Sequence, residues 1–241
     1  MPVFLLTRPE DAARGFARQM ADEFGPVQVM IAPLTGIEWA DDAPDLHGIQ
    51  ALVFTSRNGV LAYQRLDMPK GMRAYCVGEA TSRAASQVGL EAISADGDAA
   101  ALIALIAAAG QCGPILHIRG AETRGAVAHR LNQAGIETFE TVLYRQVTLP
   151  LPTEARTLLQ GNLPVIVPLF SPRSAARFAA YAPFDAPLFL AAISPAAAER
   201  LHGLETRAIV TADRPDAMSM LYAVEGLKDA ATRLEAGGDA K

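Results

Sequence analysis

Residues 51–60 read ALVFTSRNGV, and residues 165–174 read VIVPLFSPRS. Each stretch is a short apolar run that ends in hydroxyl-bearing and arginine residues, and each is followed by a helical pattern. Uninterrupted apolar runs of this length are typical of strands buried on both faces, as in a parallel sheet between two layers of helices. The two stretches therefore predict one strand–helix unit that occurs twice.

The same alternation covers nearly the whole chain. Ten apolar runs are expected to be strands: 3–7, 27–31, 51–55, 74–77, 91–94, 115–118, 138–143, 165–170, 188–192 and 207–210. Helical patterns lie between these runs. Strands that alternate with helices predict an α/β fold with parallel sheets.

Three further units repeat. VGEAT at 77–81 corresponds to ISPAA at 193–197, and the segments that follow, at 93–98 and 210–215, also correspond. The last pair breaks the order, because LTRPE at 6–10 corresponds to IRGAE at 118–122. One copy of this unit opens the chain and the other lies at mid-chain. The two copies of the fold are therefore expected to be circularly permuted.

The permuted order predicts the domain organisation. The first two strands have to pair with the last three, so residues 1–35 and 149–241 are expected to form one discontinuous α/β domain. Residues 36–148 form an inserted α/β domain. The chain then crosses between the domains twice, and the two crossings are expected to pair as a two-stranded β-ladder hinge.

Composition restricts the classes of function. The chain has 241 residues, of which 51% are hydrophobic, enough to bury a core in each of two domains. The net charge of −5 argues against nucleic acid or an acidic membrane as a partner. The longest apolar stretch, 99–109, places its large side chains on one helical face, which predicts a core helix and no membrane span.

Motifs for metal or nucleotide binding are absent from the sequence. The two cysteines, Cys76 and Cys112, lack the spacing of metal ligands, and so few cysteines fit a reducing cytoplasm. There is no Gly-x-Gly-x-x-Gly and no Walker A motif. His47, His117, His129 and His202 have no acid or nucleophile at a useful spacing, so structural or solvated roles are expected for all four.

Polar residues concentrate where the predicted strands end and the helices begin. Ligands of open α/β sheets bind at the carboxyl ends of the strands, and helix N-termini with arginines attract anions. The candidates for binding a polycarboxylate are Arg8, Thr55, Ser56, Arg57, Gly78, Thr81, Arg119, Arg124, Ser171, Arg173 and Ser194. Ser56, Thr81, Ser171 and Ser194 are equally interpretable as helix caps.

These motifs, taken in order over about residues 3–225, resemble the uroporphyrinogen-III synthase family. The resemblance lies in TRP at 7–9, FTSRNGV at 54–60, VGEAT at 77–81, IRG at 118–120, LYR at 143–145 and FSPRS at 170–174. It implies two flavodoxin-like domains of about five strands each, with the active site in the cleft between them. It also implies a cytoplasmic monomer without cofactor, with a transient contact to hydroxymethylbilane synthase.

The resemblance further implies a reaction. Hydroxymethylbilane, a linear tetrapyrrole with eight carboxylates, loses water and closes to uroporphyrinogen III with ring D inverted. Tyr144 is the candidate that assists departure of the hydroxyl. The chain departs from the family pattern at Ser194, where glycine is usual, and at Ala197, where threonine is common, which puts side-chain contacts from that loop in doubt.

Two other interpretations stay open. A hinged two-domain protein could bind a polycarboxylate or tetrapyrrole without catalysis, although such proteins are usually exported and the apolar run at 3–6 is too short for a signal sequence. The chain could also be a former domain of a fused tetrapyrrole enzyme that now serves as an interaction module.

Overall fold

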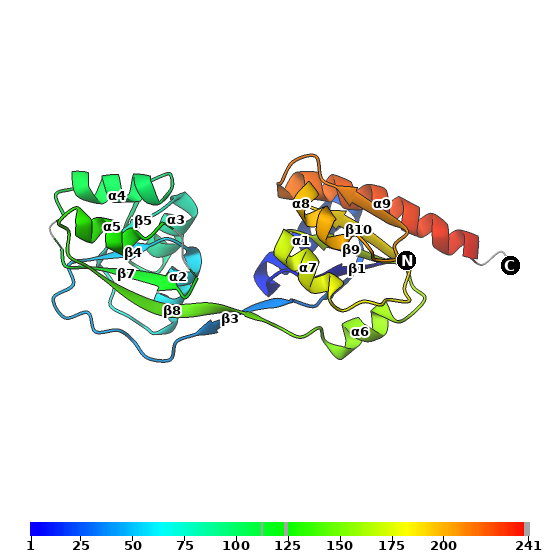
Figure 1. Cartoon of the computed structure of the whole chain (residues 1–241), viewed down its shortest axis with the longest axis horizontal. Coiled ribbons are helices and arrows are strands. Elements are labelled where there is room, and N and C mark those ends of the chain that lie inside the picture. Colours follow the sequence, from blue (N-terminus) through cyan, green and yellow to red (C-terminus); the bar gives the residue numbers. More distant parts are fainter. Residues whose placement is uncertain (112, 123–124, 239–241) are drawn as a thin grey trace. The chain divides into compact units, whose positions relative to one another are not determined.

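The computed structural model describes residues 1–111, 113–122 and 125–238 (Figure 1). The chain divides into two compact units. One unit consists of Met1–Gly36 and Thr148–Lys241, and the other of Ile37–Val147. The chain therefore passes from the first unit to the second and back again, and each unit is described by itself below.

The discontinuous unit contains a five-stranded parallel sheet in the order β11-β10-β9-β1-β2. Its strands are β1 (Val3–Leu6), β2 (Gln28–Ile31), β9 (Val165–Leu169), β10 (Leu188–Ala192) and β11 (Ala208–Thr211). Val3 pairs with Val165, so the first two strands lie in one sheet with the last three.

Helices cover this sheet, with α1 packed beside α9 and α7 beside α8 (Figure 1). They are α1 (Glu10–Phe24), α6 (Thr153–Leu159), α7 (Pro172–Ala179), α8 (Pro195–Ala198) with a 3₁₀ turn at Glu199–Leu201, and α9 (Ala217–Gly238). Apolar side chains of the helices and of both faces of the sheet, such as Phe16, Phe178 and Leu5, form one buried core.

The inserted unit is built on a six-stranded sheet in the order β3-β8-β7-β4-β5-β6. Its strands are β3 (Thr35–Trp39), β4 (Ala51–Phe54), β5 (Arg73–Cys76), β6 (Glu91–Ser94), β7 (Ile115–Gly120) and β8 (Thr138–Thr148). The strands from β8 to β6 pair in parallel. Helices α2 (Arg57–Arg65), α3 (Glu79–Gln87), α4 (Ala99–Ala108) and α5 (Val127–Gln133) complete this unit.

The five-stranded sheet and the five parallel strands of the six-stranded sheet share one topology once the chain order is permuted. In its own chain order, the discontinuous unit has the flavodoxin order 2-1-3-4-5. If β1 and β2 are instead counted after β11, the order becomes 3-2-1-4-5, which is the order of β4 to β8 in the inserted unit. The α/β fold class with two parallel sheets is therefore confirmed.

Strands β3 and β8 run antiparallel, because the backbone N–H of Ala40 bonds to Leu143 and that of Leu149 bonds to Leu34. The two crossings thus form the two-stranded β-ladder that the permuted order predicted, although the apolar runs alone indicated ten strands and ended one of them at residue 143. The polar residues of this ladder explain the difference: Glu38 pairs with Arg145 in solvent, and such strands lack an apolar run.

Helix α9 continues well past Gly226, to residue 238. Leu227 and Ala231 are buried one turn apart in the core, so the apolar helical face continues past Gly226. Among the described residues, no helix is both long enough and apolar enough to cross a membrane.

Candidate functional site

In each unit, one pair of neighbouring strands marks the point where the strand order reverses. These pairs are β1 with β9 and β4 with β7. Ligands of open α/β sheets bind beyond the carboxyl ends of the strands at such a point. Most of the predicted site residues lie in the segments that leave these four strands, so each unit gathers its own set of candidates at one edge of its sheet.

Arg8 and Phe170 meet at this edge of the discontinuous unit. The guanidinium carbon of Arg8, after β1, lies 3.8 Å from the centre of the Phe170 ring, after β9. Cation–π contact of this kind holds the guanidinium in place while leaving its N–H groups for other acceptors. Burial lowers the pKa of Arg8, but arginine remains charged at neutral pH.

Helix α7 begins at the same edge with a capping box. Ser171 Oγ accepts a bond from the Ser174 backbone N–H at 3.0 Å, and the Ser171 N–H donates to Ser174 Oγ at 3.1 Å. Arg173 lies exposed in the first turn. The capping interpretation of Ser171 is therefore confirmed, and its oxygen is already occupied by the helix.

Ser56 and Ser194 are helix caps as well, whereas the cap interpretation of Thr81 is wrong. Ser56 caps α2 by accepting from the Asn58 N–H at 3.2 Å, and Ser194 caps the short helix α8 by accepting from the Ala197 N–H at 3.4 Å. Gly78 is the N-cap of α3 without a side-chain bond, and Thr81 is buried in the first turn. Ser194, which departs from the family pattern, thus acts as the N-cap of α8.

A polar network occupies the edge of the inserted unit. Thr55 Oγ1 lies 3.2 Å from His117 Nε2, and His117 Nδ1 lies 3.3 Å from Glu140 Oε1. The other carboxylate oxygen of Glu140 accepts from the Arg119 guanidinium at 3.2 Å. Arg119 also donates to the Gly120 carbonyl at 3.0 Å. Its charge, expected to be available for substrate, is thus already paired with Glu140.

His117 is the functional candidate that the sequence analysis missed. Its side chain is fully buried, and burial lowers its pKa, which the hydrogen bond to Glu140 partly offsets by raising it. The expectation that His117 has no acid in reach is wrong, because the register of β7 and β8 places Glu140 directly opposite. A separation of 23 residues gives no such signal without that register.

Tyr144 is held by a close contact with β7. A bulge between Arg119 and Gly120 pairs Gly120 with Tyr144, and a Cβ at position 120 would lie 2.7 Å from the Tyr144 ring. Trp39 of β3 lies near the tyrosine, with ring centres 6.1 Å apart. Glycine at position 120 therefore provides the space that the tyrosine ring fills.

The remaining predictions lie apart from these groups or outside the described residues. Arg57 lies exposed at the start of α2. Arg124 and Cys112 fall outside the part of the chain that the structure describes. Within that part, no three His, Cys, Asp or Glu side chains are grouped to hold a metal ion.

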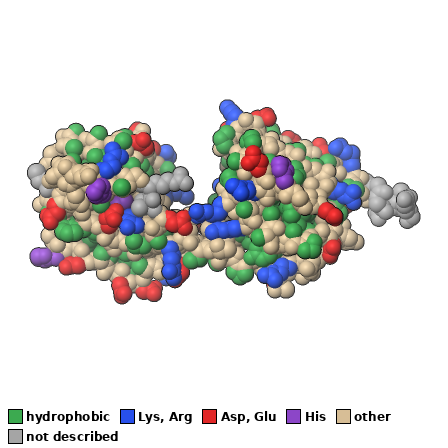
Figure 2. Space-filling view, in the orientation of Figure 1, with side chains coloured by type: hydrophobic (Ala, Val, Ile, Leu, Met, Phe, Trp, Pro, Cys, Tyr) green, Lys and Arg blue, Asp and Glu red, His purple; other side chains and the backbone are tan. Residues whose placement is uncertain are grey.

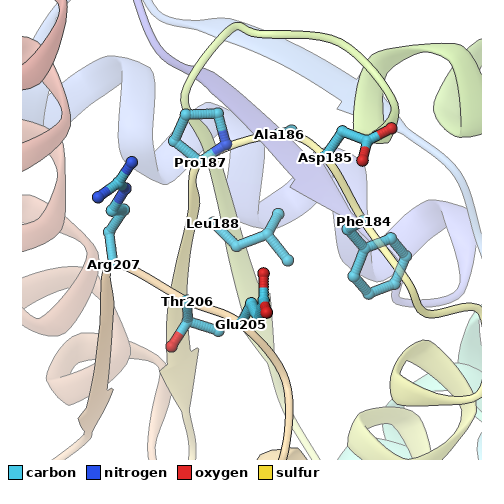
Figure 3. A pocket seen from close by; sticks show the side chains of 8 residues that line it. All are labelled: Phe184, Asp185, Ala186, Pro187, Leu188, Glu205, Thr206 and Arg207. Atoms are coloured by element: carbon cyan, nitrogen blue, oxygen red, sulfur yellow. The ribbon is translucent and has the colours of Figure 1, made fainter.

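On the face drawn in Figure 2, basic and acidic side chains are interspersed over both units. A pocket of about 260 Å³ lies at the opposite end of the discontinuous unit's sheet. Figure 3 shows Asp185, Glu205 and Arg207 around the amino ends of β10 and β11. A lining with two carboxylates and one guanidinium does not suit a polyanion.

The chain is similar to known proteins in both sequence and fold. The family model described as uroporphyrinogen-III synthase HemD matches residues 17–222, and no curated protein matches the chain. The uroporphyrinogen-III synthetase of Helicobacter pylori has a similar fold, with a TM-score of 0.64 and 17% identity. That similarity covers 94% of this chain and 100% of the other.

A mutant uroporphyrinogen III synthase of Thermus thermophilus is 14% identical, with a TM-score of 0.45, over 97% of this chain and 100% of its own. The H. pylori structure supports the fold, and the family model covers most of the chain. The permuted pair of α/β units described here therefore belongs to the uroporphyrinogen-III synthase family.

Proposed function

We propose that the chain converts hydroxymethylbilane to uroporphyrinogen III and water through the polar strand ends of its two units. The family match over residues 17–222 is the observation that carries the reaction. The geometry supports the substrate class, because both units gather arginines and helix N-termini at the carboxyl ends of their parallel strands.

Substrate carboxylates would be bound by groups that the protein has not already paired. Arg57 is exposed at the start of α2, and Arg8 is held over the Phe170 ring. The N-termini of α1, α2, α3 and α7 add partial positive charge. The oxygens of Ser56, Ser171 and Ser194 are used in helix caps, so at these positions the backbone N–H groups are the better candidates.

The chemistry requires positioning more than acid–base catalysis. The C–O bond of the terminal hydroxymethyl group breaks, and the electron-rich pyrrole supplies the electrons, which gives an azafulvene and water. The substituted carbon of ring D attacks the azafulvene to form a spiro intermediate, which fragments and recloses with ring D inverted. The protein's task is to hold the chain so that this carbon is attacked in place of the free one.

Tyr144 is proposed to donate a hydrogen bond to the departing hydroxyl. Its ring is fixed by the close approach of Gly120 and by Trp39, which places the phenol on the same strand pair as the Thr55–His117 network. We further propose that the chain acts as a cytoplasmic monomer with a transient contact to hydroxymethylbilane synthase.

Product analysis tests the reaction. Hydroxymethylbilane closes without enzyme to the type I isomer, so the purified protein is expected to yield the type III isomer in excess. Type I as the sole product would contradict the proposal and favour the non-catalytic binding protein. Sedimentation of the protein alone and mixed with hydroxymethylbilane synthase tests the monomer and the contact.

A further inference from the structure

The His117 ring lies buried between two polar partners on neighbouring strands. Glu140 on β8 faces Nδ1 at 3.3 Å, and Thr55 at the end of β4 faces Nε2 at 3.2 Å. The imidazole has no exposed surface, whereas Thr55 is only partly buried. His117 therefore connects a carboxylate to the hydroxyl of a partly exposed residue.

The two partners determine where the imidazole proton lies. The carboxylate of Glu140, paired with Arg119, can only accept a hydrogen bond, so Nδ1 has to carry the proton. Burial keeps the ring neutral, and in a neutral ring the second nitrogen is an acceptor. Thr55 then has to donate its only hydroxyl proton to Nε2, and what it presents to a ligand is the oxygen lone pairs.

We infer that His117 and Glu140 fix Thr55 as a hydrogen-bond acceptor, so that the subsite after β4 takes an N–H donor of the substrate, a pyrrole nitrogen, and no carboxylate. The identity of the donor rests on the proposed function. A carboxylate placed against the same oxygen would meet lone pairs with no proton between them. His117 is thus a positioning residue that acts through Thr55.

Nitrogen NMR of protein labelled with ¹⁵N-histidine tests the network without any substrate. We expect His117 to show the Nδ1–H tautomer at neutral pH, and the His117→Asn variant assigns its signals among the four histidines. In Glu140→Gln the amide can donate as well as accept, so the preference for this tautomer should weaken. An Nε2–H tautomer or a charged ring in the unaltered protein would overturn the inference.

A pair of matched ligands tests the ligand class. The probes are a dipyrromethane with acetate and propionate arms and its N,N′-dimethyl derivative, with equilibrium binding measured by calorimetry. The protein is expected to prefer the N–H compound by about fivefold, the value of one neutral hydrogen bond. Thr55→Val should abolish this preference, and Thr55→Ser should keep it.

The matched control is Thr157→Val on the exposed face of α6. It makes the same threonine-to-valine change in the other unit and should leave the preference for the N–H compound intact. If Thr55→Val weakens both probes equally, the hydroxyl contacts a carboxylate or packs the site, and the inference fails. It fails likewise if the unaltered protein shows no preference between the probes.

Two His117 variants separate positioning from a structural role. The amide of His117→Asn can still reach Glu140 but not Thr55, so the hydroxyl is released and the N–H preference should fall. The longer amide of His117→Gln reaches the Nε2 position, and its oxygen should restore the preference. A structural role alone would change stability or weaken both probes without altering their ratio. Because these readouts need no turnover, loss of type III product would refute the proposed function separately.

Discussion

Tyr144 and Gly120 show how one residue determines the place of another. Because a Cβ at position 120 would lie 2.7 to 3.1 Å from the tyrosine ring, Gly120→Ala should push the ring aside and leave the fold intact. Tyr144→Phe is expected to lower kcat on the order of a hundredfold with little effect on KM, the low end for a positioned proton donor.

If Gly120 acts by setting the position of the Tyr144 ring, Gly120→Ala and Tyr144→Phe affect the same catalytic contact. Their effects on activity should then not be additive. Steady-state kinetics of Gly120→Ala, Tyr144→Phe and the double variant test this. Gly120→Ala should cost little more activity when Tyr144→Phe is already present. Full activity of Tyr144→Phe would remove the phenol from the mechanism.

His117 is also expected to influence stability as a function of pH. Burial depresses its pKa in the folded protein below the ordinary value of about 6.5, so the unfolded chain binds the proton first. The contribution of neutral His117 to the free energy of unfolding is therefore complete above about pH 6.5 and is lost as the pH falls toward the pKa of the folded protein. Between about pH 7.5 and 5.5, urea unfolding should show a smaller loss of unfolding free energy in His117→Asn than in the unaltered protein. Equal losses would contradict this.

At the scale of the element, the capping box is the feature that starts α7. Ser171→Ala removes the oxygen that satisfies the Ser174 N–H and should lower the free energy of unfolding by about 1 kcal/mol. Urea unfolding of this variant is compared with Ser86→Ala, which removes an exposed hydroxyl from within α3. The control should be neutral within about 0.5 kcal/mol; equal effects would mean that the box adds nothing.

Helices and strands also differ in how far the sequence could predict them. Apolar runs such as 51–54 and 165–169 predict buried strands, and the polar residues after them indicate helix starts. The fold class and the capping role of Ser171 could therefore be predicted from the sequence. Strand β3 lacks an apolar run, so its pairing with β8 followed only from the permuted order, which requires two crossings that can form a ladder. The pairing of His117 with Glu140 could not be predicted, since it depends on the β7–β8 register.

At the scale of the molecule, the proposed domain organisation makes the inserted unit self-sufficient. A fragment of residues 37–147 contains two buried clusters and should unfold cooperatively on its own. A fragment of residues 1–147 lacks β9, so the amides of β1 and β2 should exchange hydrogen freely while β4 and β7 stay protected. Protection of β1 in that fragment would contradict the proposed organisation.

The pairing of Val3 with Val165 has a consequence for the chain during synthesis. The ribosome releases the apolar strand β1 before the inserted unit, yet its neighbour β9 emerges only after that whole unit, which can fold as soon as its last strand is free. The growing chain thus folds from its middle, and the apolar side chains of Phe4, Leu5 and Leu6 stay exposed until β9 has emerged. We expect these residues to be the segment that a nascent-chain chaperone holds.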